Sequence, residues 1–315
     1  MDAKILDTTR ILAFDFDLCV CDGTGLFDLF TQLLDIYQFI QLNKNTSQNQ
    51  KALDPNLIAA VENAYQSLAF DVAAAIKKGE LWLTRPGIPH TFDVAQRMRQ
   101  KGFLDYIMFY SNNSCPEFLS FVEAVIRLSN LNLFSTKKPV VSLIFTAETS
   151  SRMKVERAPQ GMPNAREKTR NGIIQCLEDL DLPVSKSPDI LFFDDMLHKG
   201  LGLSLKQVEP YYTLSTADQI HKVFFDSMEK SGLYKNGALK TEWQNLGIKN
   251  SLMKHTAADF KDWLYTQKLP TEFNSDQFAK EKIISDKMAT EIYEFCGVQA
   301  VNKNKSRKRR GKYKQ

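Results

Sequence analysis

The fold is decided by the stretch ILAFDFD at residues 11–17, where a short apolar run ends at two carboxylates, Asp15 and Asp17. The same pattern returns as ILFFDD at residues 190–195. Short apolar runs that stop at acids are typical of buried parallel strands whose acids lie at the carboxyl edge of the sheet. Open α/β sheets place their sites at that edge. Four carboxylates meeting there would repel one another unless a hard cation joined them, so the pattern predicts a divalent metal site.

The composition indicates a globular, soluble protein. The chain has 315 residues, of which 43% are hydrophobic and 25% charged, enough for one large or two ordinary domains. We find neither an apolar run long enough to span a bilayer nor a signal-peptide pattern, and we expect a cytoplasmic location. The cysteines show no disulfide framework spacing and suggest reduced thiols; a zinc role for Cys19 and Cys21 is the alternative.

Strand and helix patterns alternate along the first two thirds of the chain. This order predicts an α/β fold with a doubly wound parallel sheet over residues 8–225. Helical stripes at 26–40 and 54–79 predict a small helical cap inserted at about 26–80. The expected strands are 11–17, 106–110, 140–145, 190–193 and 211–214, with an exposed polar loop at 149–167.

The last third of the chain differs in charge. From residue 206 onward there are 20 Lys and Arg against 13 Asp and Glu, whereas the preceding residues hold 21 basic and 24 acidic ones. We expect a helical module at 226–300 and a basic, disordered tail at 301–315. The tail is predicted to bind an anionic membrane surface, which would make the protein peripherally membrane-associated; nucleic acid is the less favoured ligand.

The acids and their neighbours suggest phosphate ester chemistry. With a cation screening the phosphoryl charge, Asp15 can attack phosphorus as a nucleophile, and Asp17 can protonate the leaving oxygen and later deprotonate water. Ser111 ends another strand and can hydrogen-bond a phosphoryl oxygen, while Lys168 can neutralise phosphoryl charge. Asp194 and Asp195, which follow the strand at 190–193, would complete the cation site. The next list gives the remaining candidates for phosphate or substrate contact: Asn112 and Arg152.

These elements, in this order, resemble the haloacid-dehalogenase superfamily of aspartate-nucleophile phosphatases, over about residues 8–225. The ending FFDD at 192–195 is most similar to its magnesium-dependent phosphatase subgroup. The resemblance implies a Rossmann-like core and Mg²⁺ bound by the Asp15 carboxylate, the Asp17 backbone carbonyl and Asp195, with Asp194 close behind. A core of this kind with an added basic region also resembles some bacterial effector phosphatases, which would place the protein in the host cytosol or at a host membrane.

Several departures and rivals remain at this level. Cys19 stands where the family usually has Thr, and Lys154 is a rival to Lys168. The motif at 22–24 invites a shifted assignment of the nucleophile, but no strand pattern leads into it. His198 is expected not to touch substrate. Cysteine-nucleophile phosphatases are excluded, because none of the five cysteines is followed six residues later by Arg.

The sequence therefore predicts a Mg²⁺-dependent phosphomonoester hydrolase. A small cap leaves the site open, which favours a phosphoprotein substrate, with phosphotyrosine included. The first alternative is a phosphatase of sugar or nucleotide phosphates. The second is a non-catalytic module that binds lipid or nucleic acid.

Overall fold

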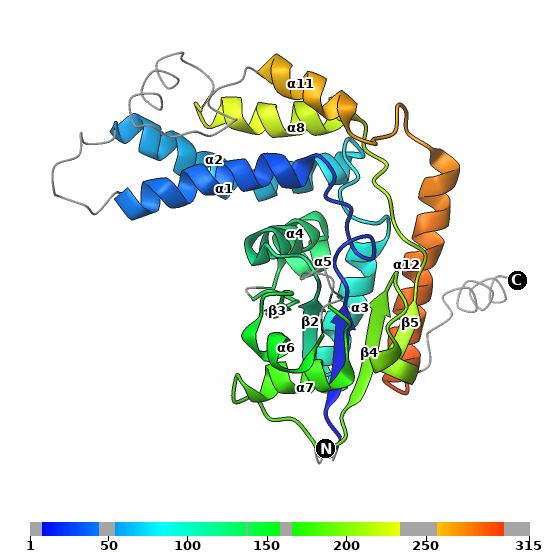
Figure 1. Ribbon diagram of the computed structural model, residues 1–315. Helices are drawn as coiled ribbons and strands as arrows, with labels where there is room; N and C mark the ends of the chain where they lie inside the picture. Colours follow the sequence, from blue (N-terminus) through cyan, green and yellow to red (C-terminus); the bar gives the residue numbers. More distant parts are fainter. Residues whose placement is uncertain (1–7, 44–53, 137, 158–165, 234–256, 299–315) are drawn as a thin grey trace, which may run out of the picture.

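A five-stranded, wholly parallel sheet forms the centre of the computed structural model, which describes residues 8–43, 54–136, 138–157, 166–233 and 257–298 (Figure 1). The strand order is β3-β2-β1-β4-β5. The strands are β1 (Arg10–Phe14), β2 (Tyr106–Tyr110), β3 (Leu143–Phe145), β4 (Asp189–Asp194) and β5 (Leu205–Gln207). The predicted α/β class with a parallel sheet is confirmed. Because the chain adds strands first on one side of β1 and then on the other, the order reverses beside β1, where such sheets bind ligands.

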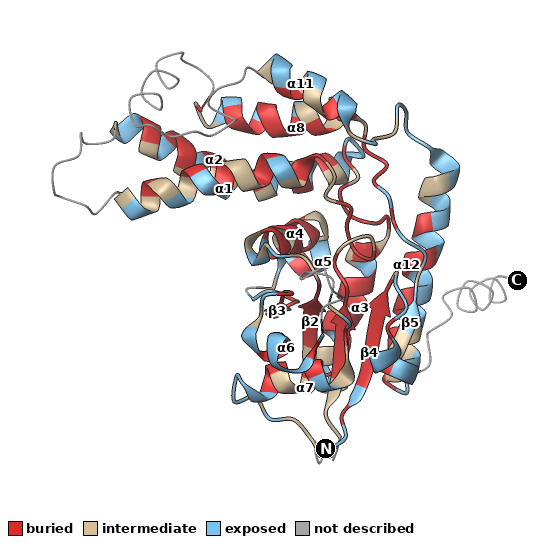
Figure 2. Ribbon diagram, viewed as in Figure 1, coloured by how far each residue is buried: buried red, intermediate tan, exposed pale blue. Residues whose placement is uncertain are grey.

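Both faces of the sheet are covered, as the buried strands in Figure 2 show. Leu12 and Phe14 pack with the core beneath α3 (Ile88–Gln100), α4 (Pro116–Ser129) and α12 (Ser275–Phe295). Ile11 and Ala13 point to the opposite face, into the cluster formed with α7 (Arg170–Glu178) and the 3₁₀ helix η1 (Lys199–Ser204). This alternation explains why the strand sequence is continuously apolar rather than alternating.

A helical layer stands over the carboxyl edge of the sheet. It consists of α1 (Leu26–Asn43), α2 (Pro55–Lys78), α8 (Ala217–Lys230) and α11 (Ala257–Thr266), with α2 packing against α1, α4 and α8 (Figure 1). The start of α2 is capped by Asp54, whose side chain accepts a hydrogen bond from the Asn56 backbone at 2.8 Å. It ends at Gly79, which adopts a left-handed φ of 73°. The layer therefore combines the two predicted helices with two helices from the last third of the chain.

The last third of the chain does not form a separate module within the described residues. The expected boundary at residue 226 falls inside α8, and α12 packs against α3 and β4 of the core. Arg85 and Glu281 form an ion pair at 2.7 Å between these parts, and both side chains are almost fully buried. The interpretation of 226–300 as a module of its own is therefore wrong. Residues 234–256 and the basic tail at 301–315 lie outside the described residues.

Two further expectations were wrong in the connecting segments. Residues 211–214 form no strand; the fifth strand is β5, and the Tyr211 backbone instead donates to the Leu18 carbonyl at 2.6 Å. The supposed exposed loop contains helix α6 (Ser150–Val155), which includes the wholly buried Arg152. A charged run was taken as solvated, although its charges are neutralised inside the protein. In the described part of the chain, none of the helices has the length and apolar character needed to cross a membrane.

Candidate active site

The register of β1 and β4 brings their terminal acids together. Phe14 lies beside Phe193 in the parallel ladder, and the backbone N–H of Asp15 continues it by donating to the Phe193 carbonyl at 2.7 Å. Asp15 directly follows β1, and Asp194 is the last residue of β4. Both carboxylates therefore leave the sheet at the same edge, beside the point where the strand order reverses.

Three carboxylates and one lysine form the centre of the site. Asp15, Asp194 and Asp195 each place a carboxylate oxygen within 4.8 Å of the others. The Lys168 Nζ lies 2.7 Å from Asp15 Oδ1 and 2.7 Å from Asp194 Oδ2, and the lysine is only 2% exposed. Lys168 stands two residues ahead of α7 rather than inside it. The rival Lys154 is exposed and pairs with Asp179 instead, so the structure brings Lys168 to the acids.

The second aspartate of the first motif faces a different group of residues. Asp17 Oδ2 accepts a long hydrogen bond from Ser111 Oγ at 3.4 Å, and Asp17 Oδ1 accepts one from Asn113 Nδ2 at 3.2 Å. The backbone N–H of Asn113 also donates to Ser111 Oγ at 3.1 Å. The Asp17 side chain thus lies outside the three-carboxylate cluster, and the metal-binding role of its backbone carbonyl stays a prediction. Asn113 was missed, although it stands in the polar run that ends the predicted strand at 106–110.

Burial and mutual repulsion shift the acids of the site. Burial, followed by the charge of Asp15, raises the pKa of Asp17 to about 6. Burial and then the charges of Asp15 and Asp194 raise the pKa of Asp195 to about 6. Burial also raises the pKa of Asp15, against the opposing charge of Lys168. These upward shifts indicate more negative charge than Lys168 offsets.

Asp194 behaves differently from its neighbours. Burial acts to raise its pKa, but a hydrogen bond from His198 and the charge of Lys168 outweigh burial and lower it. His198 is buried, its Nε2 lies 3.3 Å from Asp194 Oδ2, and its Nδ1 accepts from the Lys168 backbone at 3.3 Å. The hydrogen of the neutral ring is therefore on Nε2, directed at Asp194. His198, which we expected only to stay away from substrate, holds an acid of the cluster.

The cluster suits a hard divalent cation. Mg²⁺ prefers oxygen ligands and is commonly bound by one or two carboxylates together with substrate phosphate. The donors present are carboxylate oxygens in a buried site with surplus negative charge, which fits that preference. The zinc alternative is not favoured: burial raises the pKa of the Cys19 and Cys21 thiols well above their usual range, which disfavours thiolate ligands.

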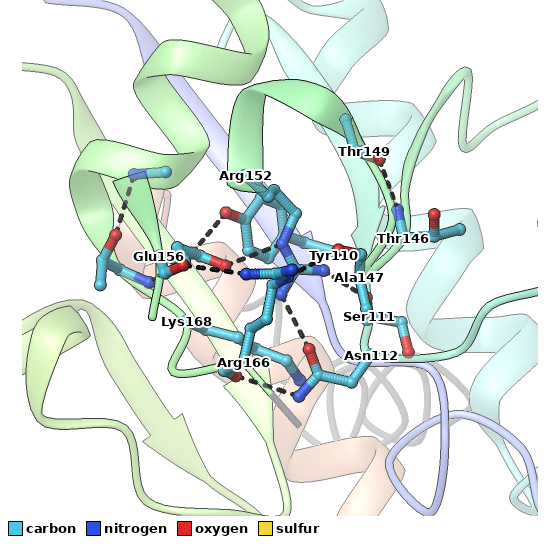
Figure 3. Close-up of polar contacts among 12 residues, drawn as sticks. Tyr110, Ser111, Asn112, Thr146, Ala147, Thr149, Arg152, Glu156, Arg166 and Lys168 are labelled. Atoms are coloured by element: carbon cyan, nitrogen blue, oxygen red, sulfur yellow. Dashed lines mark hydrogen bonds and ion pairs between the residues drawn. The ribbon is translucent and has the colours of Figure 1, made fainter. Parts of the chain in front are cut away.

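Asn112 and Arg152, which were predicted to contact substrate, are occupied by protein groups (Figure 3). The Arg152 side chain is fully buried and donates from Nη2 to Asn112 Oδ1 at 2.9 Å. Asn112 in turn donates from Nδ2 to the backbone carbonyl of Arg166 at 3.1 Å. Both residues therefore lie behind the candidate phosphate-binding residues Ser111 and Lys168. The prediction went wrong because a sequence does not reveal which charges have buried partners.

Comparison with known proteins gives no relative for this chain. It matches no family model, no curated protein and no solved structure. The function of the site must therefore be argued from its own geometry.

Proposed function

We propose that this protein is a Mg²⁺-dependent phosphomonoester hydrolase that acts through an aspartyl-phosphate on Asp15. The observation that carries the proposal is the bridging of Asp15 and Asp194 by Lys168, beside Asp195, at the carboxyl ends of β1 and β4. A nucleophilic carboxylate next to a buried cation and an oxygen-rich metal site is the set of groups that phosphoryl transfer requires.

Each residue has a defined part in the proposed reaction. Asp15, Asp194 and Asp195 would hold Mg²⁺, which supplies charge neutralisation for the phosphoryl oxygens. Asp15 attacks phosphorus as the ester oxygen leaves, and Asp17 donates a proton to that oxygen. In the second half, Asp17 takes a proton from water as the water oxygen attacks phosphorus and the Asp15–phosphorus bond breaks. A pKa of about 6 suits Asp17 to both transfers near neutral pH.

The metal part of the proposal is tested with p-nitrophenyl phosphate. Wild type should release p-nitrophenol with Mg²⁺ and stop on addition of EDTA. Asp195→Asn removes one ligand from the cluster, and we expect it to raise the Mg²⁺ concentration for half-maximal activity by about tenfold or more. Asp226→Asn, an aspartate of the distant helix α8, serves as control and should keep the wild-type value. Activity that is indifferent to EDTA would count against the metal.

A pocket beside Asp17 bears on the substrate. It has a volume of about 340 Å³ and is bounded by Asp17, Asn113, Thr24, Phe27 and Phe118, among others. The Phe27 and Phe118 rings meet edge to face, with centroids 4.9 Å apart. Aromatic walls next to the proposed acid favour an aromatic leaving group, and this supports the phosphotyrosyl side chain as substrate. The modest volume equally suits a small sugar or nucleotide phosphate, which keeps that alternative.

Replacing the half-buried aromatic wall should separate these substrates. For Phe27→Ala we expect kcat/KM on a phosphotyrosine peptide to fall by about tenfold, the scale of one lost apolar contact. Activity on the matched phosphoserine peptide, which does not reach the ring, should change little. Equal losses on both peptides would refute the aromatic pocket, and faster turnover of sugar or nucleotide phosphates than of either peptide would favour the small-molecule alternative.

A further inference from the structure

A buried ion pair stands behind the two loops that carry Ser111 and Lys168. Arg152 Nε lies 2.9 Å from Glu156 Oε2 across one turn at the end of α6, and both side chains are fully buried. Desolvating two charges is costly unless further hydrogen bonds satisfy the remaining groups. The partners of those remaining groups therefore indicate what the pair does.

The arginine holds the loop that follows β2. Arg152 Nη1 donates to the backbone carbonyl of Ser111, and Nη2 donates to Asn112 Oδ1 at 2.9 Å. Its guanidinium also stacks over the Tyr110 ring, 4.2 Å from the ring centre. Three consecutive residues at the end of β2 are thus fixed by one side chain (Figure 3). A planar guanidinium with several donors is suited to this fixed geometry, whereas an ammonium is not.

The glutamate holds the loop that carries the lysine. Glu156 Oε1 accepts from the backbone N–H of Thr169, the residue after Lys168, at 2.9 Å, and from the Tyr110 hydroxyl at 2.6 Å. The Glu156 carbonyl accepts from Arg166 Nη1 at 3.0 Å. The pair consequently spans the two loops, with Ser111 attached to the cation and Thr169 attached to the anion.

A glycine leaves room for this arrangement. A Cβ atom added at Gly172, in the first turn of α7, would lie 2.3 Å from both Glu156 Oε1 and the Tyr110 hydroxyl. Any side chain there would displace the carboxylate that binds Thr169. The space at Gly172 offers a way to disturb the glutamate without removing a charge.

We infer that Arg152 and Glu156 are positioning residues, which fix the Ser111 loop relative to the Lys168 loop so that both can grip one phosphoryl group. This inference rests on the proposed phosphatase function. Neither residue touches substrate; each acts through a backbone group next to a proposed phosphate-binding residue. A reacting group misplaced by about 1 Å can lose about 100-fold in rate, so a modest shift of one loop is sufficient to matter.

Two variants disturb the pair in different ways. Arg152→Met/Glu156→Gln removes both charges together and avoids an unpaired buried ion. Gly172→Ala keeps both charges and displaces the carboxylate. Lys154→Met is the matched control, because it removes an exposed cation from the same helix. Folding is checked by circular dichroism, and kinetics use p-nitrophenyl phosphate with saturating Mg²⁺ and inorganic phosphate as competitive inhibitor.

We expect both pair variants to lower kcat/KM by about 10- to 100-fold and to weaken phosphate inhibition, while the Mg²⁺ concentration for half-maximal activity stays unchanged. In a Ser111→Ala background the loss should be markedly smaller, because part of what the pair positions is already gone. A folded pair variant with wild-type kinetics, or the same fold loss in both backgrounds, would overturn the positioning role alone. A wild type without Mg²⁺-dependent turnover would overturn the proposed function and this inference with it. If one variant does not fold, the other decides.

Discussion

Asp15→Asn is expected to lose more than about 1,000-fold in kcat on p-nitrophenyl phosphate, because the amide cannot form the acyl-phosphate and no second nucleophile replaces it. The protein should nevertheless fold. Burial raises the pKa of Asp15, which means that its ionised form is disfavoured in the folded chain. Lys168 keeps Asp194 as an ion-pair partner at 2.7 Å after the substitution. The thermal midpoint should therefore equal or exceed that of wild type.

A matched control separates the loss of the nucleophile from a general loss of charge. Asp189 lies at the opposite end of β4 from Asp194 and is exposed. Asp189→Asn should keep wild-type kcat. Turnover by purified Asp15→Asn within tenfold of wild type would exclude Asp15 as the nucleophile.

Arg85→Met is expected to lower the free energy of unfolding by about 3–5 kcal/mol, the usual cost of leaving one member of a buried pair alone. Arg85 is fully buried and pairs with Glu281 at 2.7 Å. It also donates from Nε to the Cys19 carbonyl at 2.8 Å and from Nη2 to the Leu18 carbonyl at 3.0 Å. The same residue therefore joins α12 to the turn that follows Asp17.

Urea unfolding measures this loss, with Arg97→Met as control. Arg97 belongs to a half-exposed pair with Asp93, and its removal should change the unfolding free energy by about 1 kcal/mol or less. Removing both charges, as in Arg85→Met/Glu281→Gln, should restore part of the stability lost by the single variant. An Arg85→Met protein as stable as wild type would show that α12 does not contribute to the core.

The parallel sheet was predictable because its signal is local. Each strand is a short apolar run, and the acids after residues 14 and 193 indicate which end of the sheet carries the site. The predicted meeting of Asp15, Lys168, Asp194 and Asp195 follows from parallel strands delivering their ends to one edge. These inferences require only chain order and the geometry of an α/β sheet.

The surroundings of the site could not be predicted in the same way, because they depend on contacts distant in sequence. Arg152 looks like any charged loop residue until Glu156 and the Ser111 carbonyl are seen around it. Glu281 reads as part of a basic, polar segment, although its partner lies almost two hundred residues earlier. Buried charges of this kind carry no periodic signal, since their partners and not their spacing make burial tolerable.

The covalent intermediate on Asp15 gives the most direct test of the proposed function. In Asp17→Asn the group that activates water for the second half-reaction is missing, whereas p-nitrophenolate leaves without a proton donor. Brief mixing of this variant with p-nitrophenyl phosphate and Mg²⁺, followed by acid quench and peptide mass spectrometry, should show one phosphoryl group on the peptide that contains Asp15. Hydroxylamine should remove it, and Asp15→Asn/Asp17→Asn should lack it. A burst of p-nitrophenolate without this adduct, or an adduct on another residue, would contradict the account.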